Sequence, residues 1–212
     1  MNSNAKHTSK NITFSLITLG IIYVLLITIG IMTQSKETGY IRDDIRILME
    51  IFTMISAVLL LLFAISIDQV VEQDKRLFSI FSVLMMLGLV ILTFFCHFIN
   101  ITIGKNLIKN NEILGYLFSL TWPSLIFAVD ILAWDIFFGL SFIALGISIM
   151  DIFAKKIIAI TMIIAGILSL VGLISLPLNN MNLRYIGVFG YTVMPLITSI
   201  FYNLELNKEE KK

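Results

Sequence analysis

The sequence predicts an all-α integral membrane protein, a bundle of six transmembrane helices with a seventh span as the alternative. Apolar residues make up 58% of the 212 residues, and charged residues only 14%. The apolar residues also gather in runs close to the ~20 residues that a helix needs to cross a hydrocarbon core of about 30 Å. We therefore expect a single transmembrane domain, residues 1–212, without a sizeable soluble domain.

Each span is predicted from one apolar run between charged segments. The first run follows Lys6 and Lys10, as in a signal peptide. It is longer than the roughly 7–15 apolar residues of such a peptide, and no small-residue cleavage site follows, so we expect it to remain as a span. The six expected spans are residues 11–32, 48–67, 77–100, 123–150, 157–176 and 186–202.

The fourth span is the ambiguous one, because its apolar region is too long for one ordinary span and barely long enough for two. A seventh span would need a turn near Asp130–Asp135, which contains neither Gly nor Pro. We therefore predict one long helix, capped by Thr121 or Ser124 and with Pro123 in its first turn. Residues Ile113–Leu120 would then lie flat or re-enter on the outer face.

The basic residues predict that both termini are cytoplasmic (N-in, C-in). The dibasic pairs Lys75-Arg76 and Lys155-Lys156 fall on the same side as both termini, as the positive-inside rule requires. The first outer loop opposes this bias with three basic residues, although three acidic residues accompany them. The expected inner residues are Lys6, Lys10, Lys75, Arg76, Lys155, Lys156, Lys208, Lys211 and Lys212, and the outer ones are Lys36, Arg42, Arg46, Lys105, Lys109 and Arg184.

Ionisable side chains inside or beside the spans gather toward the outer side in this topology. A charge in hydrocarbon costs a few kcal/mol, so such residues usually pair or line water. Glu50 opens the second span, His97 closes the third together with Asn100, and Arg184 opens the sixth. With two aspartates from the fourth span, the candidate outward-facing polar cluster is Glu50, His97, Asp130, Asp135 and Arg184.

An ion pair is expected between Arg184 and either Asp135 or Asp130, because a guanidinium suits a carboxylate. The alternatives are an interfacial belt that includes Trp134, a structural salt bridge clamping the fourth span to the sixth, or a functional outward-facing pocket. The two aspartates are five residues apart, about 140° around an α-helix. We therefore expect them not to share a face, which disfavours a two-carboxylate mechanism.

The remaining candidates each have a structural interpretation beside the functional one. Glu50 follows Arg46 by four residues, so a local pair alone could account for it. His97 is either a proton carrier or a hydrogen-bonded structural residue. Pro195 removes a helical bond to the carbonyl of Tyr191 and predicts a kink, and broken helices can line transport sites.

Small residues predict close helix packing. They lie on shared faces of the last three spans: Gly139 and Gly146; Ala165, Ser169 and Gly172; and Gly187, Gly190 and Thr198.

Enzyme signatures are not found in the sequence. Two His residues cannot form an H-E-x-x-H zinc motif, and neither a G-x-S-x-G elbow nor a phosphate-binding loop is present. We predict no metal, cofactor or catalytic residue. The net charge of +1 without a basic patch argues against a nucleic-acid partner.

Two segments near the C-terminus carry a resemblance. The runs Ala133-Trp-Asp-Ile-Phe-Phe-Gly-Leu140 and Leu176-Pro-Leu-Asn-Asn-Met-Asn-Leu-Arg-Tyr-Ile-Gly-Val-Phe-Gly-Tyr191 resemble segments of small uncharacterised bacterial polytopic membrane proteins. The resemblance covers about the last 80 residues. It implies an α-helical protein of the bacterial inner membrane and no activity, substrate or catalytic residue.

Two classes of function are expected. The first is a non-enzymatic, multi-pass protein of the cell membrane that binds or transports a small solute or ion, or that serves as an accessory or immunity-type partner of a membrane complex. Its partners would be the lipid bilayer and either another membrane protein or a second copy of the chain. The second is an intramembrane enzyme that uses Asp135, His97 or Glu50 as an acid or base.

Overall fold

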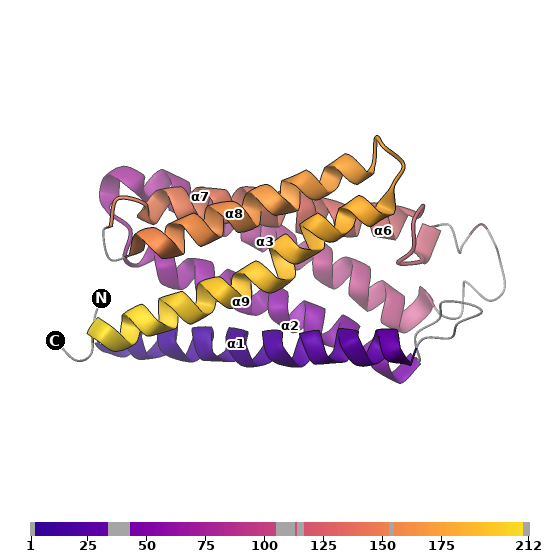
Figure 1. Ribbon diagram of the computed structural model, residues 1–212, viewed down its shortest axis with the longest axis horizontal. Helices are drawn as coiled ribbons and strands as arrows, with labels where there is room; N and C mark the ends of the chain where they lie inside the picture. The colour runs from indigo at the N-terminus through magenta and orange to yellow at the C-terminus, as the bar shows by residue number, and fades with distance from the viewer. Residues whose placement is uncertain (1–2, 34–42, 105–112, 114–116, 153–154, 210–212) are drawn as a thin grey trace.

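The described part of the chain folds into an all-helical bundle (Figure 1). A computed structural model describes residues 3–33, 43–104, 113, 117–152 and 155–209. No strand occurs among these residues, and six of their helices are long and apolar enough to cross a membrane. The predicted all-α, six-span class is therefore confirmed.

The helices extend beyond several of the predicted apolar runs. The spans are formed by α1 (Ser3–Met32), α2 (Asp43–Asp68), α3 (Arg76–Ile99), the composite α6 (Leu125–Ile131), η3 (Leu132–Phe137) and α7 (Phe138–Ile149), α8 (Lys156–Gly172) and α9 (Arg184–Glu209). Short helical turns, η1 (Gln73–Lys75), η2 (Asn100–Gly104), η5 (Leu173–Ser175) and η6 (Met181–Leu183), adjoin α3, α8 and α9. The extensions contain polar residues. A helix can continue through them because its backbone groups form hydrogen bonds within the helix whatever the side chains are.

The fourth span is one continuous helix, as predicted, and no turn interrupts it at the two aspartates. Ser124 caps it, since its Oγ accepts a hydrogen bond of 3.0 Å from the Phe127 amide. Pro123 therefore precedes the cap, and its expected place in the first turn is wrong. Residues 114–116 of the segment Ile113–Leu120 lie outside the described residues, so the expectation that this segment lies flat or re-enters stays a prediction.

Neighbouring helices in sequence are mostly neighbours in space. Contacts join α2 to α3, α7 to α8 and α8 to α9, while α3 packs on α7 and α1 lies against α2 and α9. Helix α1 begins and helix α9 ends at the same end of the bundle (Figure 1). Helices α2 and α7 end there and α3 and α8 begin there, so residues that begin α2, α6 and α9 or end α3 lie toward the opposite end (Figure 1).

Glycines bring α7, α8 and α9 together, as the small-residue faces predicted. A Cβ on Gly146 of α7 would lie 2.7 Å from the Ala159 carbonyl of α8. A Cβ on Gly190 of α9 would lie 2.9 Å from the Ala165 carbonyl of α8. Both distances are too short for a side chain, so the backbones approach as closely as glycine allows.

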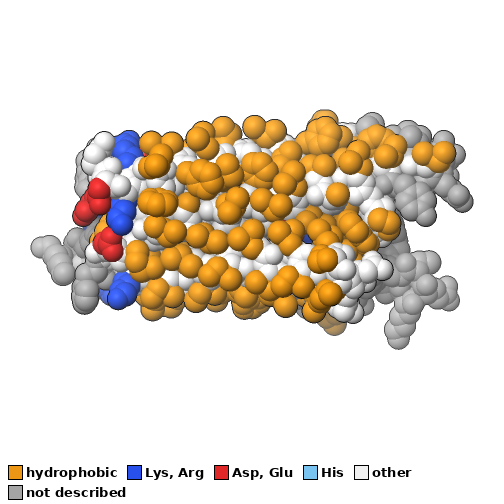
Figure 2. Space-filling model, turned by 90° about the horizontal axis from the view of Figure 1, so that it is seen from above, with side chains coloured by type: hydrophobic (Ala, Val, Ile, Leu, Met, Phe, Trp, Pro, Cys, Tyr) orange, Lys and Arg blue, Asp and Glu red, His pale blue; other side chains and the backbone are white. Residues whose placement is uncertain are grey.

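The outside of the bundle suits a bilayer. Hydrophobic side chains cover the long face seen in Figure 2, and charged side chains gather at the end that holds the termini. The exposed apolar residues include Phe81, Phe94 and Phe95 on α3 and Ile160, Ile164 and Ile167 on α8.

Candidate functional site

The five predicted cluster residues meet at one end of the bundle and form a continuous chain of contacts. Four separate spans contribute to it: α2, α3, the composite fourth span and α9. We call this chain the buried charge network. In order of contact its members are Glu50, His97, Asp130, Arg184 and Asp135.

Glu50 links α2 to α3. Its carboxylate is buried, Oε2 is hydrogen-bonded to Nδ1 of His97, and Oε1 accepts a hydrogen bond from the amide of Asn100. Arg46, one turn earlier on α2, lies farther away, with Nη1 at 3.9 Å from Oε1. Tertiary contacts therefore dominate over the local pair that the four-residue spacing suggested.

His97 stands between two carboxylates. Its Nε2 atom lies 3.4 Å from Oδ1 of Asp130, while Nδ1 contacts Glu50. Neither Nε2 nor Asp130 Oδ1 has a hydrogen-bond partner among the described residues. An ionised carboxylate only accepts hydrogen bonds, and a neutral imidazole offers one donor, so the ring can satisfy both neighbours only as an imidazolium.

Arg184 joins both aspartates of the fourth span to α9. Its Nη2 atom lies 3.5 Å from Oδ2 of Asp130 and 3.4 Å from Oδ2 of Asp135. Nη2 also donates to the hydroxyl of Tyr191 at 3.3 Å, and the guanidinium carbon lies 4.6 Å from the centre of the Phe127 ring. The structure thus contains both ion pairs that the sequence offered as alternatives.

The expected separation of the two aspartates around their helix is wrong. From Leu132 to Phe137 the fourth span is π-helical, and the Phe138 amide bonds to the carbonyl of Ala133, five residues before it. In such a turn residues five apart lie about one turn apart instead of 140° away. Asp130 and Asp135 consequently share a side and bind one guanidinium.

Asp135 is enclosed by backbone. Its exposed fraction is 0%, and a Cβ on Gly172 of α8 would lie 2.7 Å from its Oδ1 atom. Gly187 of α9 faces the same oxygen. Trp134 beside it is also buried. Both side chains therefore face other helices, whereas the side chains of an interfacial belt face the lipid headgroups.

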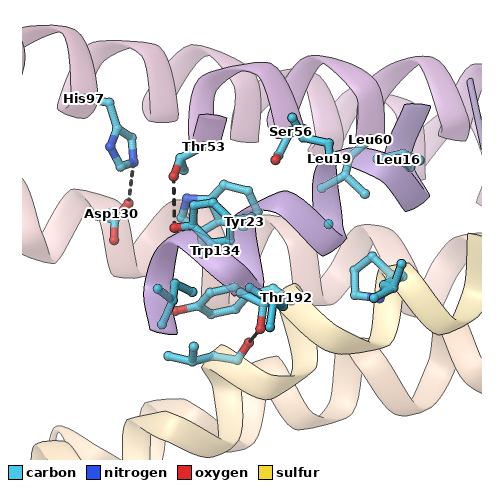
Figure 3. Close-up of a pocket in the computed structure, with 17 residues that line it drawn as sticks. Leu16, Leu19, Tyr23, Thr53, Ser56, Leu60, His97, Asp130, Trp134 and Thr192 are labelled. Carbon is cyan, nitrogen blue, oxygen red and sulfur yellow. Dashed lines mark hydrogen bonds and ion pairs between the residues drawn. The ribbon is translucent and has the colours of Figure 1, made fainter. Parts of the chain in front are cut away.

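A cavity of about 180 Å³ lies beside the network, between α1, α2 and α9. His97 and Asp130 line it, whereas Glu50, Asp135 and Arg184 do not (Figure 3). Its other polar lining comes from Tyr23, Thr53, Ser56, Trp134, Tyr191 and Thr192, and apolar side chains line the rest. The space can hold several water molecules or one small organic molecule.

Three of the lining aromatics come from different helices. Tyr23 belongs to α1, Trp134 to η3 and Tyr191 to α9, and the Tyr23 hydroxyl accepts a hydrogen bond of 3.1 Å from Thr53 (Figure 3). The sequence analysis did not assign Tyr23 or Thr53 to the site. The one signal for them was a polar group within an apolar run, which many lipid-facing residues share.

No protein-family profile, no curated protein and no solved structure matches this chain. Among the described residues, no group of three or more His, Cys, Asp and Glu side chains is arranged to hold a metal ion.

Proposed function

We propose that this multi-pass membrane protein binds a small solute in the cavity beside the buried charge network, as a solute-binding or transport protein. One observation carries the proposal: His97 and Asp130 both line the cavity, and they belong to a set of charges that four spans hold in place. Charged groups inside a membrane protein are costly and commonly mark substrate or ion pathways.

A purely structural clamp accounts less well for this arrangement. A clamp is most stable when every buried polar atom is paired, because an unpaired atom costs its desolvation energy. Here several buried atoms of the network have no hydrogen-bond partner among the described residues: Nε2 of His97 and Oδ1 of Asp130, whose residues line the cavity, and also both carboxylate oxygens of Asp135 and Nη1 of Arg184. The side chain of Asp130 is 14% exposed, against 1% for Asp135. Of the two aspartates, Asp130 is thus the one that a solute in the cavity could reach.

The enzyme alternative has less support. Of its three candidate acid–base groups, Asp135, His97 and Glu50, only His97 lines the cavity. Asp135 is fully buried against glycine backbone and does not line the cavity, so a reacting molecule would have no space beside it. A general acid or base must come within hydrogen-bond reach of its substrate.

We place the protein in the bacterial cell membrane with both termini in the cytoplasm. The Lys75-Arg76 and Lys155-Lys156 pairs support this orientation. The network and the cavity would then lie toward the outer leaflet.

The proposal is tested by occluding the cavity without touching a charge. The purified full chain is screened for thermal stabilisation by neutral, cationic and anionic small molecules. Ser56 lines the cavity, so Ser56→Leu should abolish the stabilisation. Asp151→Asn, at the opposite end of the bundle beside Lys75, should leave it intact. Stabilisation that persists in the Ser56 variant, or a panel without any stabilising compound, would contradict the proposal.

A further inference from the structure

We infer that the cavity takes a small monovalent organic cation with N–H donors, and that this cation competes with a proton for the gap between Nε2 of His97 and Oδ1 of Asp130. The inference rests on the proposed function and names the chemistry of its solute. It comes from the hydrogen-bond inventory of the site.

The gap between the two residues lacks a donor. When Nδ1–H of a neutral His97 donates to Glu50, Nε2 carries a lone pair. That lone pair lies 3.4 Å from Asp130 Oδ1, and neither atom has a hydrogen-bond partner among the described residues. Two acceptors therefore face each other, with His97 93% buried. A proton on Nε2 or an N–H group of a ligand resolves the conflict, and both cannot occupy the same position.

The charges around His97 indicate that a ligand whose N–H group occupies this position is a cation. From α2 it is faced by Glu50, behind which lies Arg46, and from the fourth span by Asp130, with Asp135 beyond. Arg184 and Tyr191 approach from α9, and Tyr23 from α1. Three carboxylates stand against two guanidiniums in this set, so one negative charge remains when the imidazole is neutral. A bound proton or a monovalent cation neutralises it.

The walls of the cavity agree with this charge. Tyr23, Trp134 and Tyr191 present aromatic rings, which attract cations through their faces. An anion would need a positive partner, but Arg184 is directed to Asp130, Asp135 and Tyr191 and does not line the cavity. A solute in the cavity would therefore be recognised by the Asp130 carboxylate and by the neighbouring aromatic rings.

Benzylguanidinium is a suitable probe, because a guanidinium keeps its charge at all accessible pH values. Benzylurea has nearly the same shape without the charge, and phenylacetate supplies the anion. Binding to the full chain in nanodiscs is measured by titration calorimetry at several pH values between about 5 and 9. Buffers of different ionisation enthalpy report how many protons leave on binding.

The cation should bind at least tenfold more tightly than benzylurea. Its affinity should rise with pH, by up to about tenfold per unit where the empty site holds its proton, with the release of about one proton per bound cation. His97→Gln should remove this pH dependence, and Asp130→Asn should weaken the cation at least tenfold without weakening benzylurea. Ser56→Leu, which keeps every charge, should abolish binding even if an Asp130 variant does not fold.

The outcomes separate the two levels of the argument. Binding of benzylurea or phenylacetate with equal or higher affinity, lost in the Ser56 variant, would overturn the cation inference and keep the proposed function. Cation binding that is independent of pH in the unaltered chain would overturn the competition with a proton. Absence of binding by all three probes, together with a negative stability screen, would overturn the proposed function as well.

Discussion

Asp130 and Asp135 place one oxygen each within 3.5 Å of the same nitrogen atom of Arg184, although they are separated by five residues along one helix. The π-helical turn that starts at Leu132 brings them to one side. The positive charge of one guanidinium is therefore shared between two buried carboxylates. The fourth span and α9 are joined by these ion pairs, one of which involves the cavity-lining residue Asp130.

The first prediction concerns this shared guanidinium. Arg184→Ala leaves two carboxylates without their cation, so it should destabilise the protein by about 3–5 kcal/mol or more. Asp135→Ala removes one partner and should cost less than Arg184→Ala, because Asp130 still pairs with Arg184. The double variant should recover part of the combined loss.

These effects are measured from chemical or thermal unfolding of the purified protein in detergent. Arg76→Ala serves as the control: Arg76 pairs with Asp68 at 3.7 Å but is half-exposed, so its loss should cost about 0–1 kcal/mol. Strictly additive losses for Asp135 and Arg184 would show that the two residues do not interact.

The second prediction tests the glycines around Asp135. A Cβ at Gly172 would lie 2.7 Å from Asp135 Oδ1 and 2.9 Å from the Cα atom of Gly187, so Gly172→Ala should destabilise the protein by about 1–3 kcal/mol. At Gly20 the nearest atom is Leu196 Cδ1 at 3.4 Å, so Gly20→Ala should be neutral or slightly stabilising. Melting temperatures of the two variants compare the sites directly, and equal effects would contradict the close packing around Asp135.

The third prediction concerns the serine contact between α3 and α7. Ser141 Oγ lies 2.9 Å from both the hydroxyl and the carbonyl oxygen of Ser82. Ser141→Ala removes an interhelical hydrogen bond and should cost about 0.5–1.5 kcal/mol. Ser148→Ala removes a bond to Leu145 within the same helix and should cost less. A reversed order in unfolding experiments would refute the role of the interhelical contact.

The fourth prediction is topological. Reporter domains fused after Lys75, Lys155 and Lys212 should all report a cytoplasmic location, because the dibasic turns and the Lys-rich tail favour the inside. An external signal at all three positions would invert the bundle. The network and the cavity would then lie toward the inner leaflet.

The spans and the network members could be predicted because a membrane imposes simple requirements. Each span must be long and apolar, and the charges that remain inside it must pair. Glu50, His97 and Arg184 stood out for that reason. The order of their contacts was not predictable, because it depends on which helix faces which. The four-residue spacing suggested Arg46 as the partner of Glu50, whereas in the structure Glu50 is also hydrogen-bonded to His97 and Asn100.

The π-helical turn and the cavity could not be predicted. A turn from Leu132 to Phe137 in place of an α-helical one depends on packing against α3 and α8, and its residues are ordinary helix formers. The cavity depends on how far α1 stands from the other helices, which an apolar run does not encode. Tyr23 and Thr53 became site residues only when these helices were placed.

The helices around the cavity are buried to different extents, and the least buried helix is the one that can move. In the most apolar part of α8, 44% of residues are buried, against 11% in α1. The backbone of α8 packs so closely against α7 and α9 that no space remains between these helices. Helix α1 has its main contacts with α2 and α9 alone. Insertion of a larger solute would therefore be accommodated by displacement of α1 into the surrounding lipid, while the charged wall keeps its geometry.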